Sequence, residues 1–255
     1  MISPISVNSS GMQRLYTQVP TTQARLSAST PEETKAKLNF APIGPGEQAI
    51  AELIDKEFNI KIKNTRDARF KKNELLVIHN QLKQLPDSDV SLIEEIVKNT
   101  GIGLELELIE AKMTKNKVVL GAYEKENRRI YIFKNMDDDS LRKTLSHEVG
   151  HAVHNHRMTV YDFLVFLQST KWKMFRQEQS FITGNSLYNI GVSLVEVAQK
   201  EWSNLHQHFD FETIKRKTSK AGGYILRAPE KWQDHPAFSN PFETFAFYYE
   251  QIYAH

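Results

Sequence analysis

The sequence contains no cysteine, and this absence removes whole classes of chemistry. Without cysteine there is no disulfide, no thiolate nucleophile and no cysteine-bound zinc, so a transition-metal site must use histidine, aspartate and glutamate. Net charge is also small, because 33 lysine and arginine residues nearly balance 31 aspartate and glutamate residues. No apolar run approaches the roughly 18 residues of a membrane-spanning helix. We therefore expect a globular protein with no nucleic-acid partner and no membrane span.

The first 45 residues lack the features of a folded domain. They are rich in serine, threonine, glutamine and proline, have no helical or strand periodicity, and lack the basic and apolar segments of a Sec signal peptide. Two interpretations stay open for this leader: a disordered tail, and an uncleaved export signal of the kind that bacterial injection systems read. Residues 46–255 are patterned throughout, and we expect one domain with an upper lobe to about residue 158 and a lower lobe over 159–255.

The patterns after residue 45 predict helices and then a small sheet. Apolar residues spaced by three and four indicate helices over 46–58, 72–86 and 88–101. Alternating leucine and glutamate over 103–111 predict a strand, and two apolar runs around the polar turn EKEN predict a hairpin. Acidic residues that are suited to cap a helix N-terminus follow the hairpin, and they predict a helix over about 139–157.

This last helix carries a His-Glu-x-x-His motif. Residues four apart on a helix point in nearly the same direction, so His147 and His151 can bind one zinc ion. Glu148 lies on the adjacent edge, where it can act as a base toward water. Gly150 costs about 1 kcal/mol relative to alanine in mid-helix, which indicates close packing against a neighbour. Arg157 stands where a longer zinc motif would have a third histidine, so that motif is excluded.

A catalytic zinc needs a third protein ligand, and helical carboxylates downstream are the candidates. Glu243 is favoured, because Pro241 begins its helix, aromatic residues anchor it, and Ala246 is small enough for close approach to the motif helix. Two alternatives stay open, namely that Glu243 only caps its own helix and that Glu196 is the ligand. His154 lies two turns along the motif helix, where packing or contact with a ligand residue is favoured over ligation.

Three segments, LGAYEKENRRIYIF, LSHEVGHAVHN and NPFETFAFYYE, together resemble the catalytic domain shared by anthrax lethal factor and the bacterial Pro-Pro endopeptidases. The resemblance covers roughly residues 75–255. It implies an α+β, zincin-like metalloprotease fold with a small mixed sheet, an edge strand, the motif helix and a mainly helical C-terminal lobe. It also implies a gluzincin-type site, with His147, His151 and Glu243 as zinc ligands and Glu148 as the base.

The chain departs from this family at one position. The family places a tyrosine seven residues before the third ligand, where it helps to hold the reaction oxyanion, and this chain has Pro236 there. Tyr224 and His235 are the candidates to replace it.

These features predict a zinc-dependent endopeptidase with one Zn²⁺ ion that activates water. The protein or peptide substrate would lie extended along an edge strand near 119–123 or 129–133. The leader adds the expectation of a bacterial effector or toxin, a virulence factor that is secreted, or injected into a host cell, and acts on a host protein. The alternative is a catalytically silent zinc-containing protein that captures a partner in the same cleft.

Overall fold

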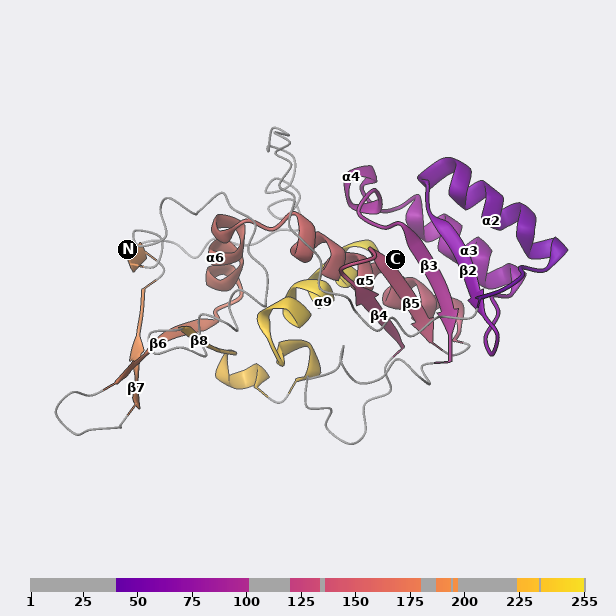
Figure 1. Ribbon diagram of the computed structural model, residues 1–255. Helices are drawn as coiled ribbons and strands as arrows, with labels where there is room; N and C mark the ends of the chain where they lie inside the picture. Colours follow the sequence, from indigo (N-terminus) through magenta and orange to yellow (C-terminus); the bar gives the residue numbers. More distant parts are fainter. Residues whose placement is uncertain are drawn as a thin grey trace, which may run out of the picture. The chain divides into compact units, whose positions relative to one another are not determined.

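In the computed structural model, Phe40–His255 form one compact unit (Figure 1), and Met1–Asn39 lie outside the described residues. The described residues all belong to this unit and comprise 40–100, 120–133, 136–179, 187–193, 195–196, 224–233 and 235–254. Phe40 and Ala41, which the sequence pattern assigns to the leader, form strand β1. The strand expected over 103–111 lies outside the described residues.

A five-stranded mixed sheet forms the frame of this unit. Its order is β1-β2-β3-β5-β4, made by Phe40–Ala41, Lys61–Thr65, Glu95–Asn99, Arg129–Phe133 and Gly121–Glu124. Strands β2, β3 and β5 run parallel, whereas β1 and β4 are antiparallel to their neighbours. The hairpin of β4 and β5 is confirmed. Among the described strands, β4 lies at the edge of the sheet and β5 lies inside it. Of the two segments expected to form a substrate-binding edge, 119–123 therefore contains an edge strand and 129–133 does not.

The prediction of one helix over 88–101 is wrong. The chain instead forms the short helix α4 (Asp87–Val90) and then strand β3. Ile96 and Val97 point to opposite faces of the sheet, and both are fully buried. A strand that is buried on both faces has a nearly continuous apolar run, which periodicity alone cannot distinguish from a buried helix.

The other predicted helices of this part are confirmed. They are α2 (Pro45–Phe58), α3 (Lys72–Leu82) and the motif helix α5 (Asp138–His156). Asp137 caps α5, since its side chain accepts a hydrogen bond from Ser140 N. Gln81 ties α3 to α5 by donating to Ser146 Oγ at 3.0 Å.

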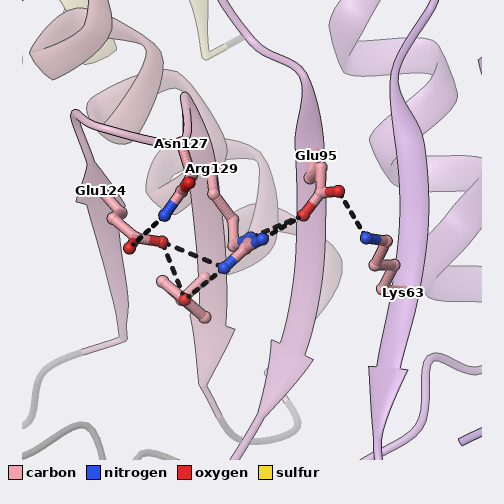
Figure 2. A network of polar contacts seen from close by, with 6 residues as sticks. Lys63, Glu95, Glu124, Asn127 and Arg129 are labelled. Atoms are coloured by element: carbon pink, nitrogen blue, oxygen red, sulfur yellow. Dashed lines mark hydrogen bonds and ion pairs between the residues drawn. The ribbon is translucent and has the colours of Figure 1, made fainter. Parts of the chain in front are cut away.

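A polar ladder crosses four strands of the sheet (Figure 2). Glu95 of β3 accepts hydrogen bonds from Lys63 of β2 at 2.5 Å and from Arg129 of β5 at 2.6 Å. Arg129 and Tyr131 both donate to Glu124 of β4, at 3.2 and 2.9 Å. These ion pairs join the edge strand to the interior of the sheet.

The chain after α5 combines helices with a second sheet. It contains helix α6 (Val160–Ser169), the antiparallel sheet β7-β6-β8, the 3₁₀ turns η2 (Glu230–Trp232) and η3 (Pro236–Phe238), and helix α9 (Pro241–Tyr253). Strands β6, β7 and β8 are Lys173–Gln179, Leu187–Gly191 and Tyr224–Arg227. The sequence patterns predict a mainly helical lobe and do not include this sheet. None of the described helices is long and apolar enough to cross a membrane.

Helices α5 and α9 are in close contact (Figure 1). A Cβ atom on Gly150 would lie 2.9 Å from Ala246 Cα and 3.1 Å from Tyr249 Cβ. The close packing expected of Gly150 is therefore confirmed, and Ala246 is the neighbour that permits it. This contact brings the first turn of α9 toward the histidines of α5.

Candidate metal centre

Helix α5 supplies two imidazoles to the candidate metal centre, and α9 supplies a carboxylate. Asn240 caps α9, because its side chain accepts hydrogen bonds from Phe242 N and Glu243 N, both at 2.9 Å. The helix cap is thus made by Asn240, and the side chain of Glu243 faces the two histidines of α5. Glu243 Oε2 lies 3.3 Å from His147 Nε2, and Glu243 Oε1 lies 3.5 Å from His151 Nε2.

The dimensions of this group suit one zinc ion. His147, His151 and Glu243 each offer one ligand atom, and these atoms all lie within 4.8 Å of one another. Two donors at about 2 Å from one tetrahedral ion are about 3.3 Å apart, close to the two separations between Glu243 and the histidines. Two imidazole nitrogens and a carboxylate oxygen are also ligands that zinc accepts.

The electrostatics of the group also favour a cation. Burial would lower the pKa of His147, but hydrogen bonds to Glu243 and Glu250 outweigh it and raise the pKa to about 10. Burial lowers the pKa of His151 to about 4, against the attraction of Glu243. The carboxylates thus favour positive charge at His147 when no metal is bound, and a metal cation held between these groups would take the place of that proton.

Glu148 lies between the metal group and the edge strand. Burial raises its pKa to about 7, against the attraction of His147 and a hydrogen bond from the backbone of Tyr123. A Cβ atom on Gly121 of β4 would lie 3.1 Å from Glu148 Oε1 and 2.7 Å from Thr144 Cγ2, so glycine allows the strand to lie against α5. A carboxyl group whose pKa is near 7 can both accept and release a proton at neutral pH.

Tyr123 ties the edge strand to α5 by both backbone and side chain. Leu120 O accepts a hydrogen bond from Phe133 N at 2.8 Å, so by antiparallel alternation the main-chain groups of Tyr123 point away from β5, toward Glu148. The Tyr123 hydroxyl lies 2.7 Å from His156 Nε2, near the end of α5. Burial raises the pKa of Tyr123, so the hydroxyl keeps its proton at neutral pH and can donate it to His156.

Other residues considered as ligands lie apart from this group. His154 is buried, and its ring lies 4.5 Å from the ring of Phe242 and 5.2 Å from the ring of His151. It therefore has the packing role that was expected. Glu196 is exposed and its N–H donates to Ser193 Oγ, and it is not among the described residues that form the metal-binding group.

The two oxyanion candidates come from different elements. Tyr224 begins β8, where its backbone pairs with Arg176 of β6. His235 precedes η3, and its Nδ1 accepts a hydrogen bond from Ala237 N at 3.2 Å. The ring of His235 lies 5.7 Å from that of Phe247, which is one turn after Glu243 on α9. The described contacts thus associate His235 with the helix that carries Glu243, whereas the side chain of Tyr224 is not among those that the structure describes.

A family model described as Peptidase family M48 matches residues 89–204. The chain is therefore similar to a family of zinc metalloproteases. The matched range contains the whole motif helix, ends before Glu243 and is less than half of the 255 residues. It supports a zinc-dependent protease of the zincin type. No curated protein and no solved structure matches the chain. The resemblance to lethal factor and the Pro-Pro endopeptidases stays a prediction.

Two residues near the metal group were not found from the sequence. Tyr123 contributes a backbone N–H to Glu148, and no residue type predicts a main-chain contact of this kind. Glu250 Oε2 lies 3.3 Å from His147 Nδ1. The spacing of Glu250 from Glu243 could have predicted this contact, since residues seven apart on a helix lie on the same side.

Proposed function

We propose that this chain is a zinc-dependent endopeptidase of the gluzincin type. His147, His151 and Glu243 would hold one zinc ion. The observation that carries the proposal is the convergence of their three ligand atoms within 4.8 Å of one another, from two helices that pack closely at Gly150. The similarity to Peptidase family M48 supports the same reaction class.

The chemistry follows from the groups beside these ligands. When bound, zinc supplies a Lewis acid that polarises a peptide carbonyl and lowers the pKa of water from about 15.7 toward 7. Glu148 takes a proton from the attacking water and passes it to the leaving amine. Its burial and the Tyr123 N–H hold the carboxylate toward the edge strand, and its pKa of about 7 suits both transfers.

We propose that the substrate is an extended protein segment that lies along β4. The main-chain groups of Gly121 and the carbonyl of Tyr123 point away from β5, in the direction in which a further strand could pair, whereas the Tyr123 N–H is bonded to Glu148. This edge is next to Glu148, so a peptide that pairs there has its main chain close to the base.

His235 is the favoured oxyanion donor, with Tyr224 as the alternative. Because Nδ1 of His235 accepts a hydrogen bond from Ala237 N, the neutral ring carries its proton on Nε2. That proton can be donated to a developing oxyanion. Thr244 holds η3 on α9 by donating to Ala237 O at 2.8 Å, which fixes the position of His235 relative to the helix of Glu243.

We further propose that the protein is a bacterial secreted effector or toxin that acts on a host protein. The support is the composition of the leader and the resemblance of three segments to lethal factor and the Pro-Pro endopeptidases. Deletion of residues 1–39 should leave hydrolysis by the purified protein unchanged and abolish transfer out of the producing cell. A large loss of hydrolysis would instead make the leader part of the catalytic domain.

The activity is tested by profiling new N-termini in a host-cell lysate after addition of wild type or Glu148→Ala. New termini should appear only with wild type, while Glu148→Ala should retain zinc, because the base is not a ligand. His151→Ala should lose zinc and cleavage together. If wild type binds one zinc ion yet cleaves nothing, the protein is the silent, partner-capturing alternative.

A further inference from the structure

Two carboxylates of α9 hold one imidazole of α5 from opposite sides. His147 Nε2 lies 3.3 Å from Glu243 Oε2, and His147 Nδ1 lies 3.3 Å from Glu250 Oε2. The two glutamates are seven residues apart, which is two helical turns, so both project from the same side of α9.

The two nitrogens of an imidazole point away from each other, so Glu250 and the metal position lie on opposite edges of the His147 ring. Glu250 is therefore not placed to be a fourth ligand, in agreement with its absence from the metal-binding group found among the described residues. What it can do is accept the Nδ1 proton. When Glu250 accepts a hydrogen bond from the Nδ1 proton, the free lone pair of the His147 ring is on Nε2. This is the nitrogen that faces Glu243 and His151.

We infer that Glu250 is a positioning residue of the metal centre, which fixes the tautomer and the ring orientation of His147 so that Nε2 binds the metal. The inference rests on the proposed zinc site. Helix α9 thus supplies one ligand and also the group that orients another ligand, and a displacement of α9 would disturb both.

The turn of α9 that carries Glu250 is anchored from the other side. The preceding residue, Tyr249, is buried and donates a hydrogen bond to Asp89 of α4 at 2.9 Å. Tyr249 also contacts α5, since a Cβ atom on Gly150 would lie 3.1 Å from its Cβ. Only 17% of the Glu250 side chain is exposed, so its contact with His147 is partly screened from water. These contacts hold Glu250 in place before a metal binds.

The test is the zinc affinity of the purified full-length protein, measured by competition with a chelator. Glu250→Ala should weaken zinc binding about 10- to 100-fold, because the acceptor of the Nδ1 proton is removed. Glu250→Gln should lose less, since an amide oxygen can still accept that proton. Glu52→Ala, which replaces an exposed helical glutamate of α2, is the matched control and should bind zinc as wild type does.

A second measurement separates orientation of His147 from general support of the fold. In long-range ¹H–¹⁵N spectra of the zinc-loaded protein, His147 should bind through Nε2 and carry a slowly exchanging proton on Nδ1. In Glu250→Gln that proton should exchange faster while circular dichroism stays unchanged. If Glu250→Ala fails to fold, this comparison of Glu250→Gln with wild type decides the inference.

The outcomes distinguish this inference from the proposed function. Equal zinc affinity of wild type, Glu250→Ala and Glu52→Ala, or a His147 signal that is the same in Glu250→Gln, would overturn the role of Glu250 alone. A wild-type protein that binds zinc with the expected dependence on Glu250 but cleaves no protein would overturn the protease proposal and leave the inference standing. Failure of wild type to bind zinc would overturn both.

Discussion

Gly150 of α5 lies directly against Ala246 of α9: a Cβ atom on the glycine would be 2.9 Å from the Cα atom of the alanine. The backbone cannot move aside as a flexible side chain could. The separation of the two helices, and with it the distance from Glu243 to the histidines, therefore depends on the absence of a methyl group at position 150.

Gly150→Ala should destabilise the protein and weaken zinc binding, even though alanine is the better helix former by about 1 kcal/mol. Overpacking of a tight contact costs about 1 to 3 kcal/mol, which outweighs that gain. The measurements are urea unfolding and chelator competition. Gly46→Ala is the control, because a Cβ atom there has no neighbour within 4 Å and the substitution should not destabilise. Equal behaviour of the two variants would contradict the role of this contact.

Glu243→Gln should weaken zinc binding steeply, since it removes the charge that holds a divalent cation but keeps the size of the side chain. The fold of the metal-free protein should survive, because Asn240, not Glu243, caps α9. Glu196→Gln is the comparison and should bind zinc as wild type does, as Glu196 is exposed. Chelator competition on both variants measures the difference. A weakened Glu196→Gln beside an unaffected Glu243→Gln would reverse the assignment.

Tyr123→Phe should lower kcat and change KM little. The substitution removes the hydroxyl that reaches His156 at 2.7 Å, so the edge strand and the N–H that orients Glu148 lose one of their ties to α5. Zinc content should be unchanged, because neither residue is in the metal-binding group. The control is Tyr161→Phe on α6, where the tyrosine is 50% exposed. Steady-state kinetics on a peptide taken from the cleavage profile gives both constants, and an unchanged kcat would contradict this role.

Glu95→Gln should destabilise the protein at neutral pH and have a smaller effect in acid. Burial disfavours ionisation of Glu95, but hydrogen bonds from Lys63 and Arg129 outweigh it, so the pKa of Glu95 is lowered from its ordinary value of 4.5. A lowered carboxyl pKa contributes stability that is present above the unfolded pKa and is lost as pH falls through the folded one. In urea unfolding, the difference in stability between wild type and variant should therefore be full at neutral pH and shrink as the pH is lowered below 4.5. A constant difference would show that the ladder acts through packing alone.

The sequence predicts those parts of the site that depend on one helix at a time. Position along α5 sets the directions of His147 and His151, and capping residues set where α5 and α9 begin. Glu243 could be chosen because its own segment carries the signals of a well-anchored first turn. These are local properties, and local sequence encodes them.

What the sequence does not predict depends on partners distant in the chain. Strand β3 resembles a helix in its pattern because both of its faces are buried, as Ile96 and Val97 show. The contact of Glu250 with His147 requires that two helices cross at one particular distance. The bond from Tyr123 to Glu148 uses a backbone group, which every residue except proline has.

The hydrogen bond from Tyr123 N–H to Glu148 also bears on self-association of the protein through the edge of its sheet. An exposed edge strand is a template for pairing with another copy of the chain, which leads toward aggregation. Strand β4 has only the four residues Gly121–Glu124, and one of its outward N–H groups already donates to Glu148. Any strand that pairs there, another copy or the proposed substrate, has only the remaining outward groups of this short strand to bond. The carboxylate proposed as the base thus also limits how much main chain the edge offers to another copy.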